Sequence, residues 1–414
     1  MTTTTVQSPS WRSPDNLIFA ALCLFAFSVV FSVTVVQIAL FLAIIFLLVK
    51  KRREHTLGDI LTSLARHPLF VPWVIYLGVC LLTALTAYYP AKGLGQLNSD
   101  FLKYVCLSSL LLAVKKEHLS TLSAVYVAAA AVSAVFGIAE VVTSLFSGDG
   151  AISRAGVLMN AVRYGEAMTI AFLLALSRLL LPRKDDSARE RLLYALSAAL
   201  IFTVILLSQT RGAYLGLAAG LAFMFAFASA TRKKLAIFAG ALLAAGAVLT
   251  ALSPSLRGNL AAMTEYRQGD FAENSRNTGI SVRLELWKLG YKMFKAHPVV
   301  GVGPDNVKKV FKKFHPEPFP EKDVFGTLNN LYIHQAAERG LLGLGALLLL
   351  FITMFIYAAK LFKSTASPYA LWAVCALPAF YVVNLTEISF QHVHTSFAIF
   401  MALAFAAAAE KETV

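Results

Sequence analysis

Long apolar runs repeat along almost the whole chain. A helix needs on the order of 20 mostly apolar residues to cross the hydrocarbon core of a membrane. About twelve runs near that length fall at residues 16–31, 34–49, 70–87, 100–114, 118–145, 163–181, 190–207, 212–229, 234–252, 341–362, 368–386 and 391–409. The first two runs are the least certain because both are short and nearly continuous. The pattern predicts an all-α, polytopic integral membrane bundle of about 12 transmembrane helices.

The composition agrees with this fold class. Hydrophobic residues make up 58% of the chain and charged residues 14%, and the mean hydropathy is +0.67. These values exclude an ordinary soluble domain. No cleavable signal follows the polar N-terminal stretch, so we expect the first run to act as the insertion signal. The four cysteines lie in or beside the runs without metal-ligand spacing and are expected to be small core residues: Cys23, Cys80, Cys106 and Cys375.

Positive charges in the short loops predict the orientation of the helices, because loops rich in Lys and Arg stay in the cytoplasm. Every second loop between the runs is basic, so all these loops fall on one side of the membrane: residues 50–53, 115–116, 183–191, 232–234 and 360–363. Both termini are then cytoplasmic, and the outer loops are 88–99, 145–162, 208–211, 253–340 and 387–390. The 253–340 loop is also basic, but loops longer than about 60 residues cross largely regardless of charge. The net charge of +14 therefore needs no nucleic-acid partner.

This topology divides the chain into three regions. Residues 1–252 hold transmembrane helices 1–9, and residues 253–340 form a large periplasmic loop with amphipathic helices and a catalytic segment. Residues 341–414 hold helices 10–12 and a cytoplasmic tail.

Three arginines stand in the short outer loops, where cations are scarce. Arg211 lies in the tight turn SQTRGA, and Arg154 and Arg163 bracket Gly156 ahead of Glu166. The alternative interpretation is that Arg211 reaches toward the membrane interface and that the other two are solvated loop residues.

Arg283 occupies an unusual position on a predicted amphipathic helix. Over residues 281–296, the apolar stripe is Val282, Leu286, Leu289 and Met293, and the opposite face carries Glu285, Lys288, Lys292 and Lys295. Arg283 lies on the apolar side, where an unpaired guanidinium is costly. It should therefore have an anionic partner, which is either a bound anion or a carboxylate such as Glu140 or Glu387. We expect the helix to lie on the membrane surface with its lysines toward water or anionic headgroups.

The segment 328–340 is the other polar region. As a helix, it would align Asn330, His334 and Glu338 on one face, so that Glu338 could orient His334 as a general base. The alternative is a hydrogen-bonded interfacial histidine. Glu387, His392 and His394 cap the outer end of the last two runs, but no converging ligand spacing supports a metal site.

Three local patterns carry a family resemblance: SQTRGAYLG at 208–216, RLELWKLGYKMFKAHPVVGVGPDNVKKVF at 283–311, and NNLYIHQAAERGLLG at 329–343. With these patterns the chain resembles the Wzy_C superfamily of bacterial envelope glycosyltransferases, most closely the O-antigen ligases. The resemblance implies that Arg211 and Arg283, with Arg154 and Arg163 as further candidates, contact the diphosphate of a lipid-linked glycan. It also implies that the third pattern, which includes Asn330 and Tyr332, carries the catalytic centre.

One position departs from the family pattern. The histidine that begins the third family motif is Asn329 in this sequence, and asparagine cannot accept a proton at neutral pH. Three explanations remain open. His334 serves as the base, the base is dispensable because stabilisation of the leaving group dominates, or the asparagine replaces a histidine and traps one state of the protein.

The resemblance implies an inner-membrane enzyme with its active site facing the periplasm of a Gram-negative bacterium. The donor would be an undecaprenyl-diphosphate-linked O-antigen and the acceptor lipid A-core, with membrane lipids around the protein. We expect no nucleic acid and no cofactor, and no metal because the sequence has no Asp-x-Asp motif or ordered carboxylate cluster in an outer loop. An O-antigen polymerase or a protein O-oligosaccharyltransferase would use the same chemistry. A transporter would need ionisable residues near the bilayer midplane, but Glu140, Glu166 and Glu387 fall near outer ends.

Overall fold

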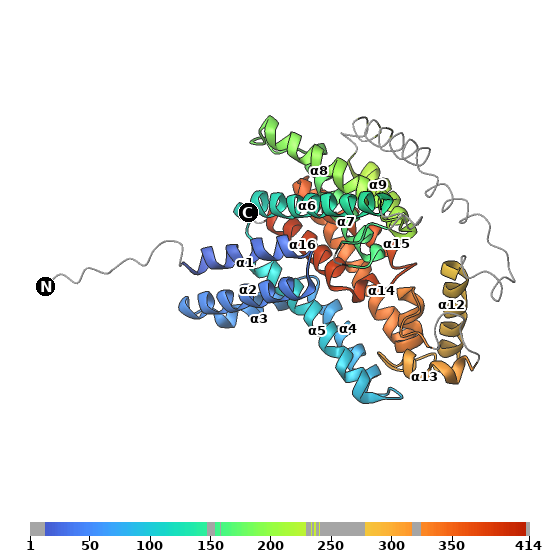
Figure 1. Cartoon of the computed structure of the whole chain (residues 1–414). Coiled ribbons are helices and arrows are strands. Elements are labelled where there is room, and N and C mark those ends of the chain that lie inside the picture. Colours follow the sequence, from blue (N-terminus) through green and yellow to red (C-terminus); the bar gives the residue numbers. More distant parts are fainter. Residues whose placement is uncertain are drawn as a thin grey trace.

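The chain is described here from a computed structural model that covers residues 13–146, 154–157, 159–228, 278–316 and 324–410, together with residues 233, 236 and 240. Every regular element within these ranges is a helix (Figure 1). The first half of the chain contains α1 (Pro14–Ser28), α2 (Val33–Arg53), α3 (Leu57–Ala65), α4 (Phe70–Leu85), α5 (Pro90–Ala113), η2 (Lys116–His118), α6 (Leu119–Phe146), α7 (Ala161–Leu180) and α8 (Ala188–Leu207). The second half contains α9 (Arg211–Phe227), α12 (Thr278–Ala296), α13 (Val307–Phe314), α14 (Leu331–Thr365), α15 (Pro368–Val383), η4 (Ser389–Gln391) and α16 (Val393–Glu410).

Eleven of the twelve apolar runs coincide with helices, and the run at 234–252 lies outside the described residues except for 236 and 240. Polar caps fix where several helices begin. Serine side chains accept backbone N–H groups at the start of α1, α2, α8 and α15, and Ser187 with Glu190 forms a complete capping box on α8. The core role expected of cysteine is confirmed for Cys80, Cys106 and Cys375, which are buried free thiols, whereas Cys23 is partly exposed.

Fewer described helices than predicted are long and apolar enough to cross a membrane. Five described helices can cross a membrane, α2, α6 with η2, α8, α14 and α16, and a sixth span results if α3 and α4, bent by 89°, form one. The apolar helices α1, α9 and α15 are shorter. Helices α5 and α7 carry Asp100, Lys103, Glu166 and Arg178 inside their apolar runs. The chain is thus a multi-pass helical membrane protein, but the count of about twelve spans is not confirmed.

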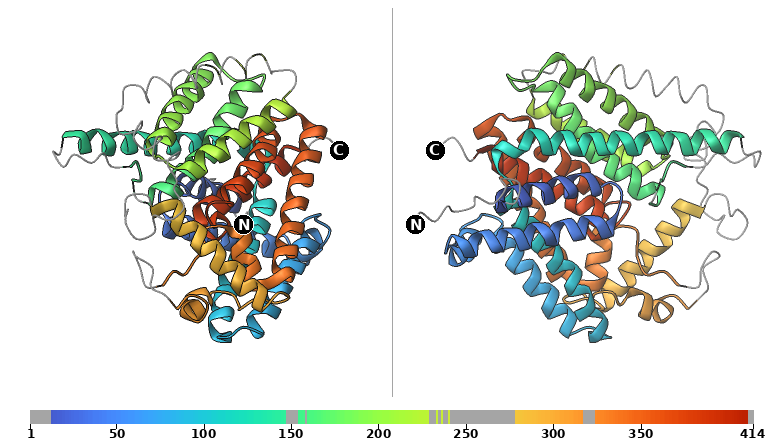
Figure 2. Two further views of the ribbon diagram at one scale, coloured as in Figure 1. Left: turned by 90° about the vertical axis from the view of Figure 1, so that its right-hand side faces the viewer. Right: turned by 60° about the vertical axis from the view of Figure 1, so that its left-hand side comes forward.

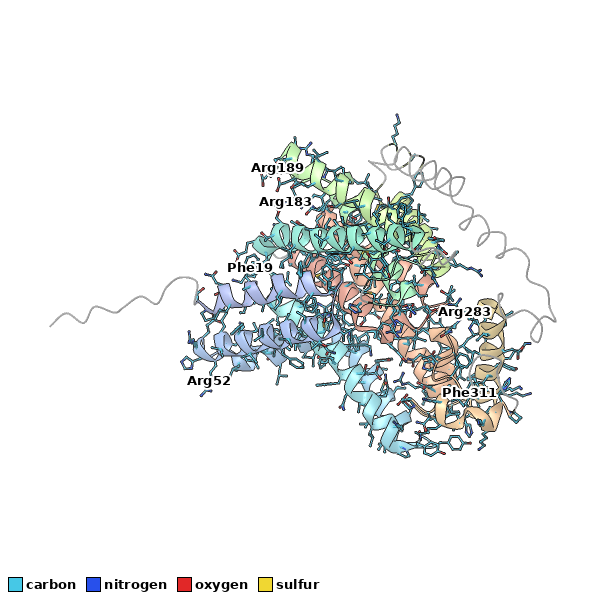
Figure 3. All side chains as sticks on the ribbon, in the orientation of Figure 1. Phe19, Arg52, Arg183, Arg189, Arg283 and Phe311 are labelled. Carbon is cyan, nitrogen blue, oxygen red and sulfur yellow. The ribbon has the colours of Figure 1, made fainter. Side chains whose placement is uncertain are left out.

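Helices α7, α15 and α16 form the centre of the bundle and are buried on nearly every side. Around them, α9 packs on α15, α8 on α7 and α6, and α1 on α2, as the two turned views show (Figure 2). The basic residues Arg52, Arg183 and Arg189 lie toward one side of the molecule, and Arg283 lies toward the opposite side (Figure 3). Three residues of the predicted cytoplasmic loops thus lie away from Arg283, and the predicted orientation in the membrane stays a prediction.

Helices α12 and α13 pack on the first part of α14. The apolar stripe of α12 is buried in this small core, with Leu286 and Met293 fully inaccessible. The expectation that this face rests on the membrane is therefore wrong, because protein covers it. Two glycines with positive φ, Gly301 (φ +70°) and Gly340, allow this packing. Gly340 (φ +62°) interrupts α14, and a Cβ on it would lie 2.2 Å from the carbonyl oxygen of Val299.

Candidate functional site

The loop before α7 is tied to the turn between α8 and α9. The guanidinium of Arg154 donates from Nε to the Ser208 carbonyl at 2.9 Å, and from Nη2 to the Gln209 carbonyl at 3.2 Å and Thr210 Oγ1 at 3.0 Å. A carboxylate oxygen of Glu140 accepts the backbone N–H groups of residues 156 and 157, both at 2.9 Å. Arg154 thus shapes the turn that ends in Arg211.

Arg154, Arg211 and Arg283 lie within electrostatic range of one another. Burial lowers the pKa of Arg154, and the positive charges of Arg283 and Arg211 act in the same direction. Burial likewise lowers the pKa of Arg211, and Arg283 adds to the effect. Arginine nevertheless stays protonated. These three guanidiniums therefore repel one another at one end of the bundle, and a bound anion would relieve that repulsion.

Arg283 has the carboxylate partner that its place on α12 requires. Its Nη2 lies 2.6 Å from Glu387 Oε1, and the two side chains are 26% and 15% exposed. Glu387 was one of two partners considered from the sequence. The other, Glu140, instead holds the loop before α7. The Nε of Arg283 is buried with no hydrogen-bond partner in the described part of the chain.

Arg163 and Glu166 extend the cluster along α7. The charges of Arg163, Arg283 and Glu387 all act on Glu166, which is only 2% exposed. Glu166 Oε2 accepts a hydrogen bond of 2.6 Å from Ser389, and its Oε1 has no partner within the described ranges. Arg154, Arg163 and Arg211 form no ion pair with a described carboxylate. We call the six groups Arg154, Arg163, Glu166, Arg211, Arg283 and Glu387 the arginine cluster.

The segment at the start of α14 borders this cluster. Asn330 is the N-cap of α14, where its Oδ1 accepts the N–H groups of Tyr332 and Ile333 at 3.0 Å each. The helix therefore begins one residue after Asn330, which does not share a helical face with His334 as expected. Asn329 has a left-handed backbone (φ +47°) and accepts a hydrogen bond from Thr327. Tyr332 donates to the Tyr381 carbonyl at 2.9 Å.

His334 and Glu338 meet as the helical spacing predicts, with Nε2 and Oε2 at 3.4 Å. Both side chains are almost completely buried. The charged groups that act on them are Arg339, Asp305 and Asp100, and none of the four arginines of the cluster is among these. The structure thus brings the pair together, and the charge that acts on both groups is that of Arg339. Its catalytic role stays a prediction.

A buried charge network was missed from the sequence. Arg339 is fully inaccessible and lies 2.6 Å from Asp100, 239 residues earlier, while Lys103 lies 3.2 Å from the same carboxylate. Arg339 also donates to Gln335 at 2.8 Å. An aspartate and a lysine inside an apolar run were the available signals, because charges in such a run are paired when buried. The network links α5 to the residue before the break at Gly340.

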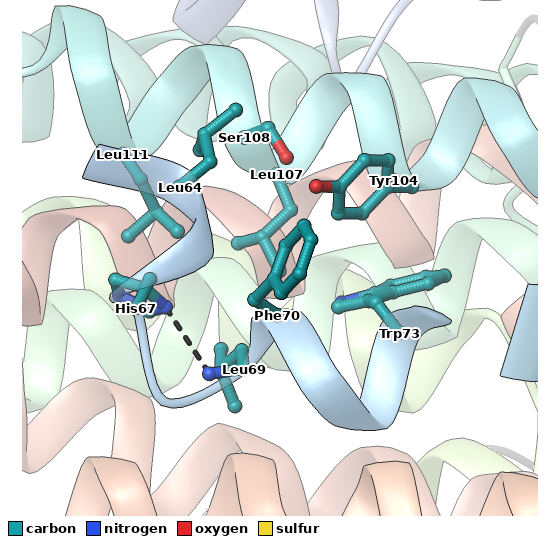
Figure 4. Close-up of a pocket in the computed structure, with 9 residues that line it drawn as sticks. All are labelled: Leu64, His67, Leu69, Phe70, Trp73, Tyr104, Leu107, Ser108 and Leu111. Atoms are coloured by element: carbon teal, nitrogen blue, oxygen red, sulfur yellow. Dashed lines mark hydrogen bonds between the residues drawn. The ribbon is translucent and has the colours of Figure 1, made fainter. Parts of the chain in front are cut away.

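Two other features lie apart from the cluster. His394 Nδ1 contacts the carbonyl of Val29 at 2.6 Å, a structural hydrogen bond. A small recess lies at the α3–α4 turn, where the Leu69 N–H donates to His67 at 3.2 Å (Figure 4). Leucines and aromatic rings dominate its lining: Leu64, Leu69, Phe70, Trp73, Tyr104, Leu107 and Leu111, with His67 and Ser108. In Figure 1, α3 and α12 lie on opposite sides of the molecule, so this recess is not the arginine site.

Comparison with known proteins finds a family similarity over the middle of the chain. Residues 196–348 match the Wzy_C family model, which is described as O-antigen ligase. This match confirms the resemblance found from the sequence, and it includes Arg211, Arg283, Asn329, His334 and Glu338. The chain is also 28% identical over 165 residues to an uncharacterized protein of Haemophilus influenzae. That alignment covers 37% of this chain and 40% of the relative.

Proposed function

We propose that this protein is an O-antigen ligase that moves a glycan from undecaprenyl diphosphate to a sugar hydroxyl of lipid A-core. The family match supports a role of the ligase or polymerase type. The observation that carries the proposal is the arginine cluster. Four guanidiniums come from the loop before α7 and from α7, α9 and α12, yet only Arg283 has a carboxylate partner within the described residues.

The chemistry of the leaving group explains why arginines are suited to this reaction. As the anomeric C–O bond breaks, negative charge grows on the diphosphate. Preorganised guanidiniums stabilise this charge more in the transition state than in the ground state, which raises the rate. They also bind phosphate oxygens bidentately. Direct attack by the acceptor hydroxyl would invert the anomeric centre.

The orientation of the bundle is part of the proposal. Arg52, Arg183 and Arg189 lie on the side opposite Arg283 (Figure 3). Loops rich in Lys and Arg stay in the cytoplasm, so the arginine cluster would face the periplasm from the inner membrane. A donor that is already activated suits a compartment without nucleoside triphosphates.

The acceptor is inferred from the charge of α12 and α13. Lysines without a carboxylate partner in the described part of the chain are exposed on both helices: Lys292, Lys295, Lys308, Lys309, Lys312 and Lys313. This surface favours a phosphorylated acceptor such as lipid A-core through charge attraction.

Reconstitution tests the proposal. Purified protein in lipid discs is incubated with undecaprenyl-diphosphate-linked glycan and lipid A-core, and glycosylated lipid A-core is measured by gel mobility and mass spectrometry. We expect the product to form, to form equally in EDTA, and to carry an inverted anomeric centre. Chain extension of the donor without lipid A-core would indicate a polymerase instead. Transfer to a protein acceptor alone would indicate a protein oligosaccharyltransferase, and movement of substrate across the bilayer without transfer would indicate a transporter.

A further inference from the structure

The ion pair between Glu387 and Arg283 occupies the guanidinium that the proposed donor needs. The contact is short, at 2.6 Å, but both side chains keep access to the surface, at 15% and 26% exposure. Access to water weakens the attraction within the pair relative to a pair sealed in the protein interior. A diphosphate that brings several negative charges to the cluster can therefore displace the single carboxylate from Arg283.

The backbone around Glu387 is fixed against the start of α14. The Leu331 N–H is shared between the carbonyls of Asn384 at 2.9 Å and Glu387 at 3.0 Å, and Asn330 Nδ2 donates to the Leu385 carbonyl at 2.8 Å. Glu387 thus lies beside the segment that begins with Asn329. A carboxylate released from Arg283 would remain close to the position where the family motif has its histidine.

Glu387 is better placed than its neighbours to exchange a proton with a substrate. The charged groups that face it are Arg283 from α12, Arg154 from the loop before α7, and Glu166 from α7. Glu166 is buried and its Oε2 is held by Ser389. His334 is buried against Glu338 and lies within range of Arg339 rather than the arginine cluster. Asn329 has no basic atom.

We propose that Glu387 accepts the proton of the acceptor hydroxyl, and that binding of the donor diphosphate to Arg283 frees it to do so. This inference rests on the proposed function. The acceptor oxygen forms a bond to the anomeric carbon while the bond from that carbon to the diphosphate oxygen breaks. The hydroxyl proton moves to the Glu387 carboxylate and then to water, and the bonding pair leaves with the polyprenyl diphosphate, which the arginines stabilise.

In this arrangement the donor must bind before Glu387 can accept a proton. Without the donor, the carboxylate is held by Arg283. With the donor, the guanidinium turns to the diphosphate and the carboxylate becomes available beside the sugar. Removal of the Glu387 charge should therefore have opposite effects on donor binding and on transfer.

The test is Glu387→Gln, with Glu285→Gln as the matched control on the outer face of α12, where Glu285 pairs with Lys288. Binding of undecaprenyl diphosphate and of inorganic pyrophosphate is measured by calorimetry, and transfer is measured with saturating donor. We expect Glu387→Gln to bind both probes about two- to fivefold more tightly, because the carboxylate that competes for Arg283 is lost. Transfer should fall about 10²- to 10⁴-fold, the usual contribution of a general base. Glu285→Gln should change neither quantity.

A structural role for the ion pair predicts the opposite binding result. If Glu387→Gln weakens donor binding in step with transfer, or keeps transfer within threefold of the wild type, the inference is overturned. Glu387→Asp provides a second variant, because it restores a carboxylate and should recover transfer at least about tenfold relative to the glutamine variant. Failure of the wild-type protein to transfer any glycan would overturn the proposed function itself. Wild-type transfer with an equally active Glu387→Gln variant would overturn only the role of Glu387.

Discussion

Substitution of Arg211 should affect anion binding without affecting the stability of the fold. It forms no ion pair with a described residue, and it adds positive charge next to Arg283. Loss of its hydrogen bonds to a diphosphate should cost about 1.5–3 kcal/mol, or roughly 10- to 100-fold in donor affinity. We therefore expect Arg211→Ala to weaken binding of undecaprenyl diphosphate by that factor with an unchanged melting temperature. A variant that binds donor as tightly as the wild type would remove Arg211 from the site.

Asn329 provides a second test at the scale of one residue. Its backbone is left-handed (φ +47°), and histidine is among the residues that tolerate this conformation. Asn329→His should therefore fold normally. Because the inference assigns the proton to Glu387, we expect transfer by Asn329→His to stay within about threefold of the wild type. A sharp rise in transfer would instead favour the view that asparagine traps one state.

The sequence predicts a residue's contacts best when the pattern that indicates them lies within one segment of the chain. The position of Arg283 on the apolar side of α12 correctly required a partner and named Glu387 among the candidates, and the spacing of His334 and Glu338 correctly predicted their contact. The pairing of Arg339 with Asp100 was not predicted, because nothing within either segment identifies a partner 239 residues away.

At the scale of elements, the Arg339–Asp100 pair joins α5 to the break in α14. Both groups and Lys103, which also contacts Asp100, are buried, so removal of Asp100 leaves two uncompensated positive charges. Such a loss costs about 3–5 kcal/mol. We expect Asp100→Leu to lower the unfolding temperature in detergent strongly, and the triple variant Asp100→Leu, Lys103→Met and Arg339→Met to recover most of the loss. A single variant as stable as the wild type would show that the pair does not hold these helices together.

The elements themselves were largely predictable because each apolar run is a local pattern. What packs against each element could not be predicted from such a pattern. The stripe on α12 indicated an apolar neighbour without showing whether that neighbour was lipid or protein, and the structure shows that it is α13 and α14. The N-terminal boundary of α14 was also misjudged, because Asn330 uses its side chain to cap the helix rather than to continue it.

At the scale of the whole molecule, apolar composition predicted the helical membrane class but not the number of spans. Composition does not separate a span from a core helix. Helix α16 passes the test for a span although 83% of its apolar window is buried inside the protein, and the short helices α1, α9 and α15 fail on length alone. The charge distribution of the loops predicted that Arg52, Arg183 and Arg189 lie away from Arg283, and Figure 3 shows these four residues on opposite sides.

Orientation in the membrane can be tested with two exposed reporters, Lys309→Cys on α13 and Arg189→Cys on α8, since three of the native cysteines are buried. In intact spheroplasts, a membrane-impermeant maleimide should label Lys309→Cys, and it should label Arg189→Cys only after permeabilisation, because the basic loops stay inside. The reverse labelling pattern would place the arginine cluster in the cytoplasm and end the proposal of a periplasmic reaction.

The central claim is that the arginine cluster holds the diphosphate of a lipid-linked glycan. The most direct measurement is a cryo-electron microscopy structure of the protein in lipid discs with undecaprenyl diphosphate bound. We predict diphosphate density within hydrogen-bond distance of Arg211 and Arg283, with Glu387 turned away from Arg283. Diphosphate density elsewhere in the protein, with the Arg283–Glu387 pair intact, would contradict the account.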